Sequence, residues 1–220
     1  MDERVVVTGL GAVTPLGNDV PSYWDGLVAG RSGVGPMLAY DATGHAVRIA
    51  AEIKDLDVAG LLGRKQARRL DRFSQIALIA SDQAVADAGL DLEDSDLSRD
   101  AAVLLGTAVG GITTMLHGAN VLRDRGPRRV SALMIPMMMS NAAAGEIAIR
   151  HGLHGLTLSV VSACASGTHA IGEAARLIRT GAAPVVICGG SEAGMHPLAL
   201  AAFGNMQAVS RRNDEPGRAS

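Results

Sequence analysis

Aromatic side chains are almost absent from these 220 residues, which contain one Trp, two Tyr and two Phe. The core must therefore be built from Ala, Val, Leu, Ile and Met, as in closely packed helices on a sheet. Charge of one sign is not in excess either, because the formal net charge is −2, while 48% of the residues are hydrophobic. These values exclude an intrinsically disordered chain. The 27 glycines follow no period, which excludes a collagen-like chain.

Cysteine is nearly absent as well, since only Cys164 and Cys188 occur. Two cysteines are too few for the disulfide framework of a small secreted protein. The first residues, MDERVVVTGL, carry acids where a signal peptide carries bases. The least charged stretch, residues 155–172, is interrupted by Gly, Ser, Thr and His, so it is a poor membrane span. We expect a cytoplasmic protein that has no membrane partner.

Common cofactor and metal motifs are missing too. The sequence has no P-loop, and GLGAVTPLG lacks the spacing of a dinucleotide-binding fingerprint. The six histidines show no spacing typical of metal ligands. The low aromatic content and the slightly negative charge argue against binding to nucleic acid. We expect no metal, no cofactor and no nucleic-acid partner.

Short apolar runs alternate with segments of helical periodicity, which indicates an α/β fold whose strands are buried by helices. No linker interrupts this rhythm, so we expect one α/β unit rather than two domains. We expect residues 39–58 to form an insertion into the α/β pattern that contains short strands. The methionine-rich segment 131–140 is either an adaptable surface that repacks around apolar ligands or a loop that is buried in the core or at a subunit contact. Strands are expected at residues 5–8, 101–106, 156–163 and 184–188, and helices at 21–29, 69–88, 112–125, 141–149, 167–179 and 198–209.

The strongest chemical feature is Cys164, which follows an apolar strand and precedes a helix by two or three residues. Free N–H groups and the positive end of a helix dipole favour a thiolate at such a corner. An ordinary buried cysteine is about as consistent with the pattern. His169 lies five positions further on and is expected to face elsewhere and serve packing. Cys188 has no such corner and is expected to be structural.

Positive charge is concentrated in two clusters. Residues 63–72, GRKQARRLDR, contain five bases and one acid, and residues 123–129, RDRGPRR, contain four bases and one acid. Such clusters would accelerate the encounter with an acidic partner, and a solvated helix face is the favoured explanation where no partner is implied.

Seven motifs taken together resemble the β-ketoacyl-[acyl carrier protein] synthases, and among them the type II condensing enzymes. They are VVVTGLGAVTPLG, ARRLDRFSQ, GTAVGG, GPRRVS, VVSACASGTHAIGEAARLIRTG, VICGGSEA and AFGNMQAVSRRNDEP, in this order. The resemblance covers residues 5–220. It implies a thiolase-like fold, an α/β unit that is duplicated into α-β-α-β-α layers in the full enzyme, and a homodimer.

The resemblance also assigns roles to residues. Cys164 would accept an acyl group from acyl carrier protein as a thioester, and its N–H would supply half of an oxyanion hole. Decarboxylated malonyl carrier protein would then attack that thioester and extend it by two carbons. The remaining implied sites are an acyl pocket at Val109, Ala163 and Phe203 and a carrier-protein surface at Lys65, Arg68, Arg69, Arg128 and Arg129.

In this family, two active-site histidines, a lysine and the second oxyanion donor come from the half that follows. We therefore interpret residues 1–220 as the N-terminal half of a β-ketoacyl synthase, expected to be inactive alone. Two alternatives stay open: a type II polyketide ketosynthase, and a non-catalytic scaffold or partner subunit. The preferred acyl chain length is also open.

Overall fold

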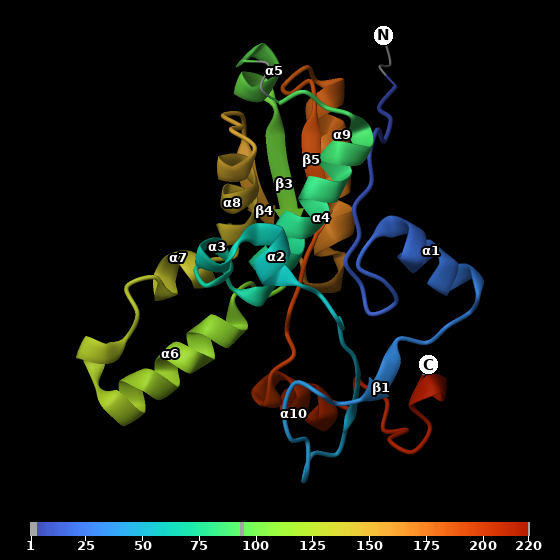
Figure 1. The fold of residues 1–220 in the computed structure, drawn as a ribbon, viewed down its shortest axis with the longest axis vertical. Coiled ribbons are helices and arrows are strands. Elements are labelled where there is room, and N and C mark those ends of the chain that lie inside the picture. Colours follow the sequence, from blue (N-terminus) through green and yellow to red (C-terminus); the bar gives the residue numbers. More distant parts are fainter. Residues whose placement is uncertain (1–3, 93–94, 220) are drawn as a thin grey trace. The chain divides into compact units, whose positions relative to one another are not determined.

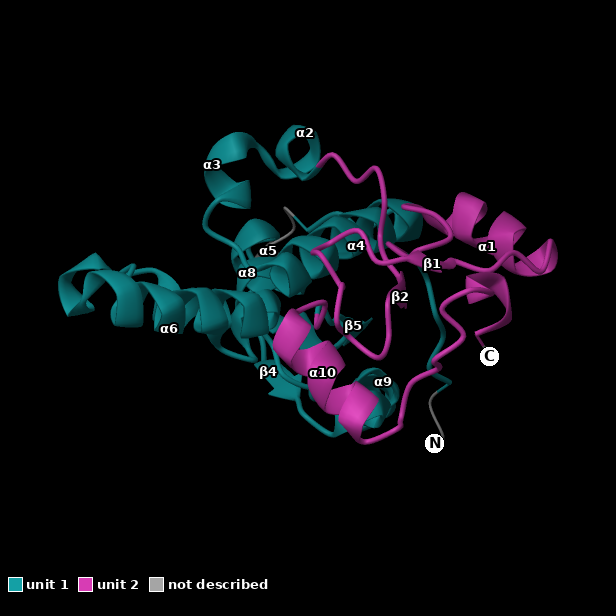
Figure 2. Cartoon of the chain, turned by 90° about the horizontal axis from the view of Figure 1, so that it is seen from below, with its two compact units in different colours: residues 1–11, 58–193 teal, residues 12–57, 194–220 magenta. Residues whose placement is uncertain are grey.

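The computed structural model describes residues 4–92 and 95–219 (Figure 1). This part of the chain divides into two compact units (Figure 2). The first unit contains residues 4–11 and 58–193, apart from 93 and 94; the second contains residues 12–57 and 194–219. The sequence patterns predict one α/β unit, whereas the contacts of the described residues separate two units. Because the second unit is assembled from two segments distant in sequence, no linker marks it.

The sheet of the first unit has three parallel strands in the order β4-β3-β5 (Figure 1). The central strand is β3 (Ala102–Gly106), which is buried along its whole length, with β4 (Thr157–Val160) and β5 (Val186–Gly190) on its two sides. Carboxyl ends of parallel strands meet at one edge of a sheet, where open α/β folds carry their sites. The segments after β3, β4 and β5 therefore meet at that edge.

Three helices pack around this sheet: α4 (Arg72–Ala88), α8 (Ala142–Arg150) and α9 (Ser166–Arg179). Helix α9 contacts all three strands, α8 contacts β3 and β4, and α4 packs on α8. Small residues allow the close approach of α9. The cluster under it contains Ala102, Leu104, Ala170, Leu177 and Ala183.

Local signals set the bounds of α4. The Asp71 carboxylate accepts a hydrogen bond from the N–H of Phe73 and caps the first turn, so the helix begins three residues later than predicted. Gly89 ends the helix in the left-handed conformation, at φ 59°. Phe73 and Leu78 are completely buried. Each such side chain contributes about 1.5–3 kcal/mol of burial free energy.

The methionine-rich segment contains a helix, α7 (Met134–Met138), so its prediction as a loop is wrong. Pro136 stands in the first turn of α7, where a missing N–H costs no intrahelical hydrogen bond. The first unit also contains α2 (Val58–Leu62), α3 (Arg64–Ala67), α5 (Ser95–Asp100), α6 (Ile112–Arg125) and the 3₁₀ turns η1 (Pro127–Arg129) and η2 (Ala163–Ala165).

The predicted strand at residues 5–8 is not present, because this segment forms no ladder with the sheet. Helix α4 holds the segment instead. A Cβ on Gly11 would lie 1.8 Å from the Ala80 carbonyl oxygen, and one on Gly9 would lie 2.2 Å from that of Ala84. The N–H of Leu10 donates to the Asp87 carboxylate at 2.8 Å.

The second unit is organised by β1 (Val34–Pro36) and β2 (Ile49–Ala51), which pair antiparallel. Asn213 joins its two segments, since its amide accepts from the N–H of Arg48 at 2.7 Å and donates to the Ala46 carbonyl at 3.1 Å. Strand β2 confirms the short strand expected within residues 39–58. The other elements are α1 (Val20–Val28), α10 (Pro197–Asn205) and the 3₁₀ turn η3 (Pro216–Arg218).

An ion pair between α4 and the end of α8 makes the stability of the first unit depend on pH. Arg150 Nε lies 2.6 Å from Asp82 Oδ1, and His151 Nε2 lies 3.3 Å from the same oxygen. Partial burial raises the pKa of Asp82, but hydrogen bonds and charge from His151 and Arg150 outweigh it and lower that pKa below its ordinary value. A carboxyl group with a lowered folded-state pKa stabilises above its unfolded pKa of about 4, and this stabilisation is lost as pH falls through the folded pKa.

We therefore expect Asp82→Asn to lower the free energy of unfolding at pH 7 by about 1–2 kcal/mol. The difference in the free energy of unfolding between this variant and the parent should shrink as the pH falls below 4. Urea unfolding at several pH values measures it, with Asp96→Asn as the control because the Asp96–Arg99 pair is mostly exposed. A deficit that stays constant down to the lowest pH would contradict the linkage.

Candidate active site

Cys164 stands on a corner between β4 and α9. The strand ends at Val160, the 3₁₀ turn η2 carries the cysteine, and α9 begins at Ser166. The side chain is an exposed free thiol. The strand–turn–helix corner predicted from the sequence is thus confirmed, at the carboxyl edge of the sheet.

The backbone of this corner is held in a strained conformation. Ala163, directly before Cys164, has φ 53°, in the left-handed region that favours glycine. Ser166 stabilises the turn because its hydroxyl lies 2.7 Å from the Ala163 carbonyl and accepts from the N–H of Ser162 at 2.9 Å. The same hydroxyl lies 3.2 Å from the Thr107 carbonyl. The corner is thereby tied to the end of β3.

Three glycines allow α9 to begin this close to the sheet. A Cβ on Gly106 would lie 2.3 Å from the carbonyl carbon of Ser166, and one on Gly190 would lie 2.9 Å from the Cα of Gly167. No side chain fits between these backbones. The position of the thiol therefore follows from backbone packing at the ends of β3 and β5.

His169 does not serve packing as predicted. It is exposed, and its Nδ1 lies 2.7 Å from the Ser162 hydroxyl, so the ring faces back toward the turn. Its position in the first turn of α9, seven residues beyond Ser162, makes this bond possible. The sequence prediction did not consider the residues before Cys164 as partners.

The residues expected to form the acyl pocket lie in different places. Val109 lies in the loop after β3 with half of its surface exposed, and Ala163 adjoins Cys164. Phe203 is an exposed residue of α10 in the second unit. A shared pocket for these three residues therefore stays a prediction.

The first basic cluster forms a defined surface. Arg64, Lys65, Arg68 and Arg69 line a hollow of about 450 Å³ together with Leu133 from the segment before α7. The sequence predicts three of these bases. Arg64 belongs to the same run and could have been included, whereas no sequence signal connects Leu133 with it. Arg128 and Arg129 are exposed on η1 and do not line this hollow.

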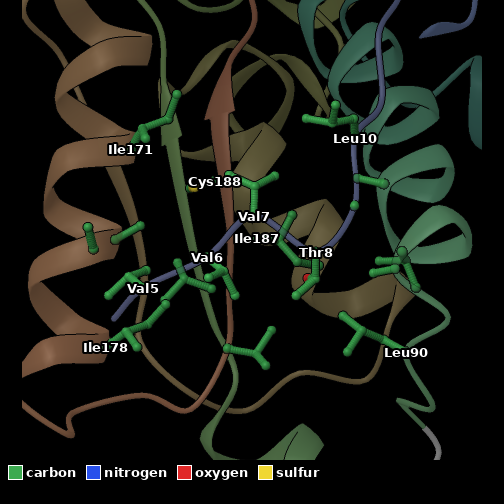
Figure 3. Close-up of a pocket in the computed structure, with 18 of the residues that line it drawn as sticks. Val5, Val6, Val7, Thr8, Leu10, Leu90, Ile171, Ile178, Ile187 and Cys188 are labelled. Carbon is green, nitrogen blue, oxygen red and sulfur yellow. The ribbon is translucent and has the colours of Figure 1, made fainter. Parts of the chain in front are cut away.

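A second, apolar slot of about 360 Å³ opens between residues 5–10 and β5, with α4 and α9 contributing its other walls (Figure 3). Val6 and Val7 are 68% and 75% exposed along it. Cys188 also lines the slot; its side chain is exposed to solvent, and partial desolvation by its surroundings raises the pKa of its thiol. Cys188 therefore has a less acidic thiol than an ordinary cysteine.

Neither a metal centre nor a membrane span is found in the described ranges. Among residues 4–92 and 95–219, no three His, Cys, Asp or Glu side chains are grouped to hold a metal ion. Within the same ranges, no helix has the length and apolar character needed to cross a membrane.

Proteins of one family are similar to this chain along its whole length. The N-terminal domain of β-ketoacyl synthases matches residues 2–220. A 3-oxoacyl-[acyl-carrier-protein] synthase 2 of Synechocystis sp. is 46% identical over 218 residues, which are 99% of this chain and 52% of that protein. The protein of the same name from Vibrio harveyi is 40% identical over 99% of this chain and 52% of its own length. The chain thus spans about half the length of these relatives.

Solved structures agree with these similarities. A β-ketoacyl synthase from Burkholderia phymatum superposes with a TM-score of 0.84 and 31% identity, over 96% of this chain and 52% of that one. The ketosynthase in the complex AntDE:AntF, a type II polyketide synthase acyl-carrier protein with its ketosynthase, gives a TM-score of 0.81 and 26% identity, over 96% of this chain and 58% of that one. The thiolase-like α/β fold expected from the sequence is confirmed. The chain belongs to the β-ketoacyl synthase family and contains the N-terminal domain of that family.

Proposed function

We propose that Cys164 is the acyl-accepting nucleophile of a condensing enzyme of fatty acid elongation. The observation that carries the proposal is the exposed thiol at the N-terminal end of the 14-residue helix α9. Thiolate attack on the carbonyl of an acyl thioester forms the new C–S bond on Cys164 Sγ. The carrier protein's sulfur leaves as a thiolate and takes up the proton released from the Cys164 thiol. Backbone N–H groups at this corner suit the developing oxyanion.

The second half-reaction extends the chain. Loss of CO₂ from malonyl carrier protein leaves a carbanion, which attacks the Cys164 thioester and expels the thiolate, giving a 3-oxoacyl carrier protein two carbons longer. This step needs groups that stabilise an enolate, for which the family uses two histidines. We propose that the half of the family's length not spanned by this chain supplies them, and that the chain alone does not decarboxylate malonyl carrier protein.

The alternatives are less well supported. The ketosynthase of a type II polyketide synthase is 26% identical to this chain, and the ishigamide ketosynthase/chain length factor is 28% identical, whereas the 3-oxoacyl-[acyl-carrier-protein] synthases 2 of Synechocystis sp. and Vibrio harveyi are 46% and 40% identical. This difference favours the fatty acid reaction. A non-catalytic scaffold has no need of a strained corner that presents a thiol, so Cys164 argues against that role.

Transfer of a single acyl group tests the proposal. The chain is mixed with acyl-loaded carrier protein, and the mass of the intact chain and of its peptides is measured. We expect one acyl group on Cys164 and none in Cys164→Ala, whereas Cys188→Ala should be acylated like the parent. Acylation at Cys188, or an unmodified chain that circular dichroism shows to be folded, would contradict the proposal.

The basic hollow is proposed as the docking surface for the acidic carrier protein. Lys65 and Arg69 are exposed there, and charge of this kind acts mainly on the rate of encounter. We expect the double variant Lys65→Glu/Arg69→Glu to lower the rate of acyl transfer by about 10-fold or more at low salt, and by less at 0.5 M salt. Arg31→Glu/Arg48→Glu is the control, because both residues are exposed on the second unit and the charge change is equal. Equal losses in both variants would argue against this surface.

A further inference from the structure

Glu192, an exposed residue two positions beyond the end of β5, accepts several hydrogen bonds from one loop. Its Oε2 atom accepts hydrogen bonds from the Thr107 hydroxyl at 3.1 Å and from the N–H groups of Ala108 and Val109 at 2.8 and 2.9 Å. Two successive backbone N–H groups form a concave site for an anion, and bonds to a charged acceptor are stronger than neutral ones. One carboxylate oxygen thus holds three consecutive residues.

These residues form the loop after β3 that carries Val109. The loop is fixed at both ends by other contacts, since Thr107 donates its N–H to the Val160 carbonyl and Gly111 donates its N–H to the Met138 carbonyl. Between these ends, the main-chain N–H groups of Ala108 and Val109 point to Glu192. The position of the Val109 side chain therefore depends on the Glu192 carboxylate.

The same contacts connect Glu192 with the thiol corner. Thr107 donates its hydroxyl to Glu192, and its carbonyl lies 3.2 Å from the hydroxyl of Ser166, which holds the turn of Cys164. The contacts from Glu192 through Thr107 to Ser166 connect the segments after β5 and β3 with the first residue of α9. A change at Glu192 reaches the Val109 loop directly and the Cys164 turn only through two intermediates.

We infer that Glu192 is a positioning residue that fixes the Val109 loop beside Cys164 and thereby sets which acyl lengths the thiol accepts. The inference rests on the proposed function. A carboxylate suits the role because both of its oxygens only accept hydrogen bonds. A glutamine would either direct its NH₂ group toward the N–H and hydroxyl donors of the loop or offer them a single neutral oxygen. The loop is then held less firmly, and the space that Val109 occupies becomes variable.

The test compares acyl transfer to Cys164 from carrier protein loaded with a four-carbon or a twelve-carbon acyl group. In Glu192→Gln we expect the ratio of the two rates to change by about 10-fold, which corresponds to about 1.4 kcal/mol of discrimination. A variant that is merely less folded lowers both rates by the same factor and leaves the ratio unchanged. Glu173→Gln is the control, because Glu173 is exposed on α9 and pairs only with Arg176 among the contacts recorded for it.

Hydrogen exchange gives an independent measurement. The N–H groups of Ala108 and Val109 should exchange faster in Glu192→Gln, while those of β3 keep their protection. An unchanged rate ratio in a chain that is normally acylated at Cys164 would overturn the inference and leave the proposed function standing. A parent chain that is not acylated at all would overturn both. Unchanged exchange at Ala108 and Val109 would also overturn the inference.

Discussion

Gly106→Ala is expected to destabilise the first unit by about 3 kcal/mol or more, at the upper end of what overpacking costs. The new Cβ would lie 2.3 Å from the carbonyl carbon of Ser166, 2.4 Å from its oxygen and 2.5 Å from the nitrogen of Gly167. All three are backbone atoms, so no side-chain rotation relieves the contact. Helix α9 must move away from the sheet.

The displacement also moves Cys164, because the turn that carries it is bonded to Ser166. A misplacement of about 1 Å costs about 100-fold in rate in well-positioned reactions, so acylation of Cys164 should fall by about that factor. Equilibrium unfolding in urea and the rate of acyl transfer measure the two effects. Because one steric contact causes both effects, we expect the free energy of unfolding and the rate of acyl transfer to fall together.

Gly145→Ala is the matched control for this substitution. Gly145 stands in α8, and a Cβ there meets no atom within 4 Å. Alanine favours a helix over glycine by about 0.5–1 kcal/mol, so this variant should be slightly more stable and normally acylated. If Gly106→Ala unfolded at the same urea concentration as the parent, the close packing of α9 on β3 would not matter for stability.

Local sequence patterns correctly predicted the elements whose structure is determined by interactions between residues close in sequence. Strand β3 is an apolar run buried on both faces, and helix α6 has the predicted bounds, residues 112–125. The cysteine corner was predicted because a strand, a small-residue turn and a helix follow one another within a few residues. In each case, the determining interactions are local.

The segments that were predicted wrongly, or not connected at all, depend on contacts between residues that are distant in sequence. Residues 5–8 have the composition of a strand, but a strand needs a partner, and α4 holds this segment through Gly9 and Gly11. The second unit is joined by contacts such as Arg48 with Asn213, which are 165 positions apart. Glu192 and its donors at Thr107, Ala108 and Val109 are 83–85 positions apart, so no local pattern could connect them.

The chain alone is expected to release no CO₂ from malonyl carrier protein, with a rate at least about 1000-fold below that of a complete family member. General acid–base groups contribute about 10²–10⁴ in rate, and an oxyanion donor about 10²–10³. His169 is bonded to Ser162 on the corner itself and is the nearest histidine in sequence to Cys164. The apolar slot between residues 5–10 and β5 also leaves valines exposed, which promotes self-association.

A complementation experiment tests whether the missing catalytic groups come from the other half of the family's length. The part of the Synechocystis relative that lies outside its match to this chain is prepared as a separate polypeptide and mixed with the chain. We expect CO₂ release and a 3-oxoacyl product to appear, the product to require Cys164, and both to be accompanied by protection of Cys188 from alkylation, since Cys188 lines the slot that the second polypeptide would cover. Cys164→Ala with the same polypeptide is the control and should show the protection without the 3-oxoacyl product. Steady CO₂ release by a monodisperse preparation of the chain alone would show that its own residues suffice, and the division of catalytic groups between the two halves would then be wrong.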